Sequence, residues 1–223
     1  MHYFVTRRTY DATQHQFTEN FAAKSRYVGV SAGPSGPFTR YQYNAADWAK
    51  RVVGQSDSGE VLIFVHGFNN TQNECVDRML RIKSGLKTQN FNGAVIAFDW
   101  PSKTSYGVAR GHAKRSAGFL ILDCINALQA EKANVKIHIM SHSLGCYLTL
   151  RGFAQAGDPP APLSLKGGVQ QVLFVAPDVK QASLAKGTGY AMVMTKRCKR
   201  LTNYASHLDL VRDASGKNPL YYG

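Results

Sequence analysis

Cysteines are few in this sequence, and long apolar runs are absent. The four cysteines form no C-x-x-C pair and have no metal-ligand spacing; Cys124 and Cys146 lie in apolar contexts and are interpreted as core residues. No apolar run approaches the roughly 20 residues that span a bilayer, so we do not expect an integral membrane protein. The first residues carry no basic-then-apolar signal, which favours a cytoplasmic protein, or a periplasmic or secreted one if processing has removed a signal.

Motifs that hold nucleotides or metals are also absent. The sequence contains no G-x-x-x-x-G-K-[ST] phosphate loop and no G-x-G-x-x-G fingerprint. No group of His, Cys and acidic residues has the spacing of a metal site. We therefore expect no cofactor and no metal-assisted hydrolysis.

Acidic residues are scarce relative to basic ones. The 27 Lys and Arg against 14 Asp and Glu give a formal net charge of +13. Such an excess favours phosphates, anionic lipid surfaces and acidic partners. The basic residues concentrate at 103–115 and 180–200, without the aromatic pattern of a nucleic-acid module. We expect peripheral contact with an anionic membrane and no specific nucleic acid; the alternative is a solvated basic face. The oligomeric state is not predicted.

Apolar strand-like runs alternate with helical periodicity along the chain. After residue 60, the pattern predicts strands followed by helices, which is typical of a parallel sheet covered on both faces. We expect a three-layer α/β sandwich in one domain, 1–223, with N-terminal strands and loops at 1–60 and the core at 61–223. The expected strands are 2–6, 27–30, 61–65, 94–98, 135–140, 169–175 and 201–205; the expected helices are 45–53, 73–87, 111–132 and 144–155.

The strongest chemical signal is the pentapeptide SHSLG at 141–145. A predicted strand enters it and a predicted helix leaves it, which is the context of a nucleophile elbow with Ser143 as nucleophile. The tight turn requires small residues two positions away; Gly145 satisfies this, whereas Ser141 stands where glycine is usual. The N–H of Leu144, at the start of the helix, would be one oxyanion donor.

A second signal follows the strand at 61–65. The segment HGFNN at 66–70 lets the backbone bend towards the elbow and present another N–H, that of Phe68. Acyl transfer needs both motifs, since the attacking serine requires a stabilised oxyanion.

These segments together resemble the α/β-hydrolase superfamily, in particular a bacterial branch of it. The resemblance rests on VTR at 5–7, HGFNN at 66–70, DWPS at 99–102, SHSLG at 141–145, APD at 176–178, and YAS at 204–206 with Asp209. It implies an α/β-hydrolase fold and a triad in the order Ser, Asp, His.

The acid and the base of this triad have alternatives. The resemblance favours Asp209 as the acid, with Asp178 as the acid of a minority arrangement or a structural residue. Only His207 lies after the last expected strand; it could pair with Asp178, and no histidine follows Asp209. The other explanation is that the natural chain continues past Gly223 and supplies the histidine there.

The leading hypothesis is a serine hydrolase that cleaves small-molecule or lipid esters through an acyl-enzyme on Ser143, as an esterase or lipase-like enzyme. The competing hypothesis is a catalytically impaired protein with the same fold that binds a polyanion or anionic lipid. An incomplete triad motivates it.

Overall fold

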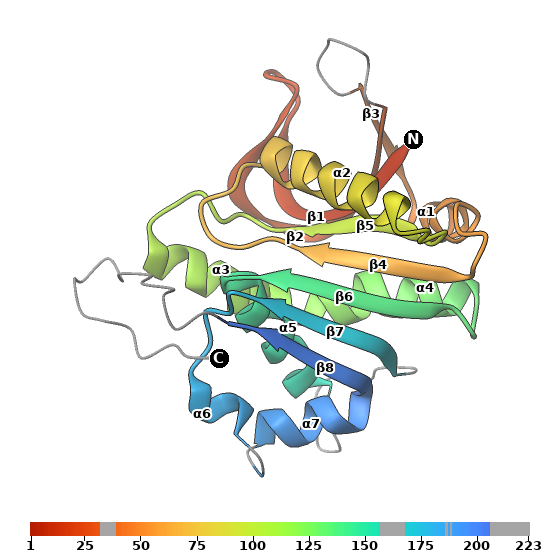
Figure 1. Cartoon of the computed structure of the whole chain (residues 1–223). Coiled ribbons are helices and arrows are strands. Elements are labelled where there is room, and N and C mark those ends of the chain that lie inside the picture. The colour runs from red at the N-terminus through yellow and green to blue at the C-terminus, as the bar shows by residue number, and fades with distance from the viewer. Residues whose placement is uncertain (32–38, 157–167, 186, 188, 206–223) are drawn as a thin grey trace.

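The computed structural model of the chain describes residues 1–31, 39–156, 168–185, 187 and 189–205. Its central feature is one eight-stranded sheet in the order β3-β2-β1-β5-β4-β6-β7-β8 (Figure 1). β2 pairs antiparallel with β1 and β3, and the pairs from β1–β5 through β7–β8 are parallel. The strands are β1 (His2–Asp11), β2 (Gln16–Ser31), β3 (Thr39–Tyr43), β4 (Glu60–Val65), β5 (Ala94–Asp99), β6 (Lys136–His142), β7 (Val169–Val175) and β8 (Cys198–Tyr204).

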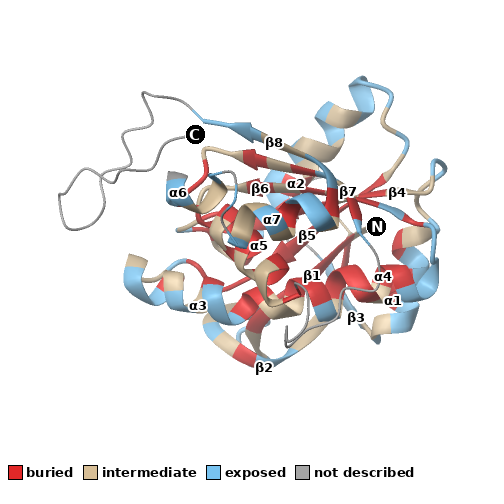
Figure 2. Ribbon diagram, turned by 90° about the horizontal axis from the view of Figure 1, so that it is seen from below, coloured by how far each residue is buried: buried red, intermediate tan, exposed pale blue. Residues whose placement is uncertain are grey.

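Helices cover both faces of the sheet. On one face α2 packs against β1, β4 and β5; the other face carries the larger apolar core, to which α1, α3, α4, α5 and α7 contribute (Figure 1). Figure 2 shows the buried residues concentrated in the inner strands and in α5. The helical segments are α1 (Ala45–Val53), α2 (Gln72–Thr88), α3 (Tyr106–Phe119), the π-helical turn η1 (Leu120–Ile125), α4 (Asn126–Glu131), α5 (Leu144–Gln155), α6 (Gln181–Leu184) and α7 (Gly189–Arg197). The predicted three-layer, mostly parallel α/β architecture is confirmed.

The N-terminal region departs most from the sequence-based expectation. The strand expected at 2–6 runs on to Asp11 and forms a long hairpin with β2, and β3 was not predicted. Arg7 and Arg8 obscured the strand, because two adjacent charged residues are typical of a surface loop, yet both are fully buried here. Their guanidinium groups have polar partners in the interior, and such pairing is what lets a buried charge persist.

Other boundaries changed less. The helix expected at 111–132 begins at Tyr106 and contains the π-helical turn, and α6 and α7 were not predicted. Cys124 and Cys146 are fully buried, as expected, and the described chain leaves its other two cysteines reduced and buried as well. Over the described ranges, no helix is long and apolar enough to cross a membrane.

Candidate active site

Ser143 lies at the sharp turn between β6 and α5, with φ 51° and ψ −124°. A positive φ is costly for a residue with a Cβ, so the surrounding contacts must hold it. The Ser143 N–H donates to the carbonyl oxygen of Val175 at 3.0 Å. Its own carbonyl oxygen accepts from the N–H groups of Cys146, at 2.9 Å, and Asp178, at 3.1 Å. The turn is therefore fastened to the ends of β6, β7 and α5, and Ser143 remains partly accessible.

The tight turn at Ser143 requires small residues two positions before and after it, and Ser141 and Gly145 occupy these positions. A Cβ added to Gly145 would lie 2.5 Å from the backbone oxygens of both Val65 and His66, so this position accepts only glycine. Ser141 replaces the usual glycine on the other side. It is fully buried, and its hydroxyl forms a 2.7 Å hydrogen bond with that of Thr149 in α5, which satisfies its polar atom.

The HG loop, residues 66–70, follows β4 and contacts the elbow directly. A Cβ added to Gly67 would lie 2.9 Å from Ser143 Cβ and 2.9 Å from His142 O, so the loop packs against the elbow with no room for a side chain at this position. Leu144 is the first residue of α5, where backbone N–H groups have no acceptor within the helix. Phe68 follows Gly67, and its ring makes an edge-to-face contact with that of Tyr106. The HG loop, which carries Phe68, therefore packs directly against the turn between Ser143 and Leu144.

Asp178, just past the end of β7, lies beside the elbow. In addition to the backbone bond to Ser143, its Oδ2 accepts a 2.7 Å hydrogen bond from the Tyr106 hydroxyl. Its Oδ1 has no hydrogen-bond partner within the described part of the chain, and the residue is 7% exposed. Burial raises the pKa of Asp178, while the Tyr106 hydroxyl and the Arg110 guanidinium oppose that rise. The site therefore contains a buried carboxyl group with one oxygen open to a donor.

The two remaining candidates, His207 and Asp209, lie outside the described residues. The described chain ends its last strand at Tyr204, whose carbonyl oxygen accepts a hydrogen bond of 2.8 Å from the N–H of Ala176. This bond joins the ends of β7 and β8, two residues before Asp178 in the sequence.

Several other histidines already have polar partners. Both ring nitrogens of His66 contact other residues within the interior. His112 Nδ1 lies 3.0 Å from the carbonyl oxygen of Pro101, and His138 Nε2 lies 3.5 Å from a carboxylate oxygen of Glu60, at the opposite end of the sheet from the elbow. None of these three is an unengaged imidazole next to Ser143.

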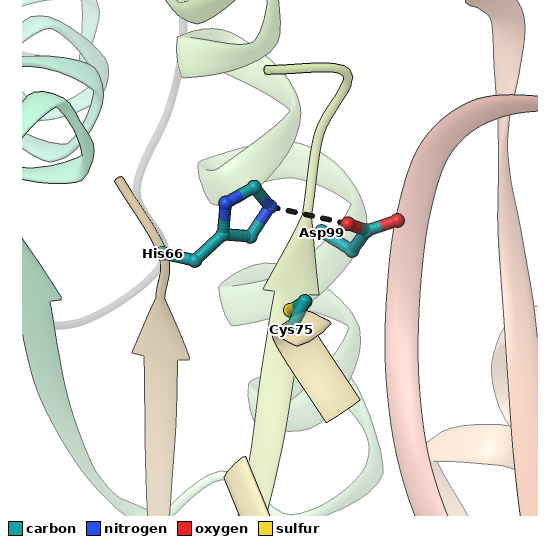
Figure 3. A group of neighbouring side chains, drawn as sticks. All are labelled: His66, Cys75 and Asp99. Carbon is teal, nitrogen blue, oxygen red and sulfur yellow. Dashed lines mark hydrogen bonds and ion pairs between the residues drawn. The ribbon is translucent and has the colours of Figure 1, made fainter. Parts of the chain in front are cut away.

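A buried group of potential metal ligands lies behind the HG loop. Figure 3 shows His66, after β4, pointing towards Asp99 at the end of β5, with Cys75 of α2 beside them. The group does not fit a cation, because the guanidinium of Arg8 already neutralises Asp99. Burial raises the pKa of the Cys75 thiol well above its ordinary value and keeps it in the protonated form, which is not the metal-binding form.

Sequence reasoning missed two residues of this region. Arg8 was hidden in an unpredicted part of β1, and Tyr106 lies before the predicted start of its helix. A usable signal for Arg8 was the acid Asp99 at the end of a fully apolar strand: a buried carboxylate requires a buried cation or several donors.

The sheet order, the strained serine and the adjacent HG loop define an α/β-hydrolase fold. Residues 42–217 match the family described as "Alpha/beta hydrolase of unknown function (DUF900)", and the chain belongs to this family. A solved structure titled as an iodinated complex of acetyl xylan esterase is similar, at 11% identity and a TM-score of 0.40, over 70% of this chain and 88% of that one. A likeness at this level says nothing about the reaction. The comparison with curated proteins found no match.

Proposed function

We propose that this protein is a serine hydrolase that cleaves carboxylic esters through an acyl-enzyme on Ser143. The observation that carries the proposal is the strained Ser143 turn, held against the HG loop and at the start of α5. Strain of this kind at an accessible serine is a feature of nucleophiles in this fold. In this proposal the backbone N–H groups of Leu144, at the start of α5, and of Phe68, in the HG loop, stabilise the oxyanion.

The reaction has two acyl-transfer steps. Ser143 Oγ attacks the ester carbonyl carbon while an imidazole takes its proton, and the oxyanion of the tetrahedral intermediate accepts from Phe68 and Leu144. The carbon–oxygen bond to the alcohol breaks, and the imidazolium returns the proton to the leaving alkoxide. Water then attacks the acyl carbon while the same imidazole takes its proton. The bond from the acyl carbon to Ser143 Oγ breaks, the imidazolium returns the proton to Oγ, and the carboxylic acid leaves.

His207 is the proposed base within these 223 residues, and its orienting acid is Asp209 or Asp178. The family pattern favours Asp209. The position of Asp178 beside Ser143, with Oδ1 open and Oδ2 bonded to Tyr106, supports Asp178. If Asp209 is the acid, Asp178 acts through its backbone N–H, which holds the elbow.

Covalent labelling tests the nucleophile. Intact mass after reaction with a fluorophosphonate should show one adduct on the wild-type chain and none on Ser143→Ala. Ser116→Ala is the matched control, because Ser116 is a fully buried serine whose hydroxyl has no hydrogen-bond partner in the described chain. Absence of an adduct on folded wild-type protein would refute the proposal and favour the binding-protein alternative.

Paired amide substitutions decide between the acids. Asp178→Asn keeps the shape of the side chain and the backbone bond to Ser143, but it removes the negative charge and replaces one acceptor oxygen with an NH2 group. If Asp209 is the acid, Asp209→Asn should slow labelling by at least about 100-fold, since loss of the triad carboxylate costs up to about 10⁴, and Asp178→Asn should slow it far less. The reverse order assigns the acid to Asp178, and equal small effects would exclude both.

A further inference from the structure

Arg8 is a fully buried cation in β1, an inner strand of the sheet that carries the elbow. It extends from β1, which runs parallel to β5 with Thr6 opposite Asp99. Its Nε donates to both oxygens of Asp99 at 3.0 and 2.9 Å, and its Nη1 forms an ion pair with Glu19. Thr6 adds a 2.6 Å hydrogen bond to the same aspartate. Burial raises the pKa of Asp99, but Arg8, His66 and Thr6 outweigh it and hold the pKa below its ordinary value.

The remaining nitrogen of Arg8 connects two loops. Nη2 donates to the carbonyl oxygens of Asn70 and Trp100, at 2.8 Å each. Neither residue lies in a strand, so the pairing of strands in the sheet does not join these two loops here. One guanidinium therefore ties the end of the HG loop to the segment that follows β5. A lysine could not replace it, because its donors radiate from one nitrogen atom, whereas these acceptors lie around a planar fork.

The end of the HG loop at Asn70 is fixed by further bonds. The Asn70 side-chain amide donates to the carbonyl oxygens of Gly67, at 3.2 Å, and Phe68, at 2.7 Å. The Ser102 hydroxyl accepts from the Asn70 N–H and donates to the Asn70 carbonyl, at 3.0 and 3.1 Å. Asn70 thus sets the curvature of the loop, and Arg8 and Ser102 hold Asn70.

The other end of the loop depends on Asp99. His66 Nε2 lies 3.1 Å both from Asp99 Oδ1 and from the backbone nitrogen of Trp100. The rings of His66 and Trp100 are stacked at 7°, with centroids 5.3 Å apart, and the indole N–H donates to His66 O at 3.0 Å. The Arg8–Asp99 pair therefore contacts both ends of the HG loop: Arg8 bonds to Asn70, and Asp99 contacts His66.

We propose that Arg8 is a positioning residue for the oxyanion-binding backbone: it sets where the HG loop places the Phe68 N–H relative to Ser143. The proposal rests on the proposed function, since it requires an oxyanion. Donors aimed at developing charge act in the transition state more than in the ground state, so a displaced loop lowers kcat and leaves KM nearly unchanged.

The test compares Arg8→Lys with wild type on a short-chain p-nitrophenyl ester and with a fluorophosphonate. Arg8→Lys should lower kcat by at least about 10-fold, with KM within about twofold and an unchanged apparent pKa in the pH–rate profile. Removing one oxyanion donor costs about 10² to 10³ in kcat, so a displaced donor should cost less. Val52→Ala is the stability-matched control, because Val52 is fully buried in α1, on the face of the sheet opposite α2 and the Arg8–Asp99 pair. It should lower the Tm and leave kcat unchanged.

Ser102→Ala keeps the test decisive if Arg8→Lys does not fold. It removes the hydroxyl that bonds to both the N–H and the carbonyl of Asn70, and it leaves the buried Arg8–Asp99 ion pair intact. It should also lower kcat, with KM unchanged. Normal kcat in a folded Arg8→Lys variant, or in Ser102→Ala where Arg8→Lys does not fold, overturns the inference while the proposed function stands. A wild-type chain inert to both reagents refutes the proposed function, and the inference with it.

Discussion

Replacing Gly145 by alanine should disable the site through geometry alone. The new methyl carbon would lie 2.5 Å from the backbone oxygens of Val65 and His66, and ordinary contact begins near 3.4 Å, so the elbow and the end of β4 must separate by roughly 0.9 Å. Backbone atoms cannot rotate away as a side chain can. Overpacking of this kind costs about 1–3 kcal/mol, and at roughly 2 to 4 °C per kcal/mol the Tm should fall by about 2 to 12 °C.

The same separation moves Ser143 away from the HG loop. Misplacement of about 1 Å can cost about 100-fold in rate, so fluorophosphonate labelling of Gly145→Ala should slow by about two orders of magnitude. Gly85→Ala is the matched control: it lies in α2, a Cβ there meets nothing within 4 Å, and the helix should gain slightly in stability. Wild-type labelling and an unchanged Tm in Gly145→Ala would refute the close contact on which the site is built.

Three further predictions concern charge. Burial raises the pKa of Asp178, so its ionisation lowers the free energy of unfolding. The loss begins as the pH rises past the unfolded pKa, about 3.9, and is complete above the folded pKa. Asp178→Asn should therefore raise the Tm at pH 7.5 by an amount that shrinks towards pH 4, and equal melting curves at pH 7.5 would contradict this. Tyr106→Phe removes the hydroxyl that donates to Asp178 and should lower the unfolding free energy by about 1.5–3 kcal/mol in urea denaturation, because hydrogen bonds to charged groups contribute that order. A Cm equal to that of wild type would show that solvent replaces the bond. Binding to anionic vesicles, driven by the net charge of +13, should weaken sharply as salt rises above about 0.1 M, where the Debye length is about 10 Å. Sedimentation with neutral vesicles is the control, and salt-independent binding would exclude the electrostatic contact.

The core of the fold could be predicted because its signals are local. The runs at 61–65 and 94–98, within β4 and β5, are apolar throughout, as expected of strands buried on both faces. α2, which follows β4, has a capping box formed by Thr71 and Glu74. Ser143 and the HG loop were found the same way, since a strand, a short turn motif and a helix are contiguous in the sequence.

Prediction failed where partners are distant in the sequence. Arg8 and Asp99 are 91 positions apart, and Tyr106 and Asp178 are 72 positions apart. No periodicity links such pairs. In the local sequence a buried arginine cannot be told from a surface one, which is why the extended part of β1 was missed.

By itself, the sequence determined the alternation of strands and helices, the turn that carries Ser143, and the glycine that this turn requires. The tertiary structure decided which polar residues share the interior: it placed Asp178 under Tyr106 beside Ser143, and Arg8 between the loops after β4 and β5. The physical reason is that backbone conformation depends mainly on neighbouring residues. The position of a buried charge depends instead on which donors and acceptors the sheet order brings together, because an unpaired charge cannot remain in the interior.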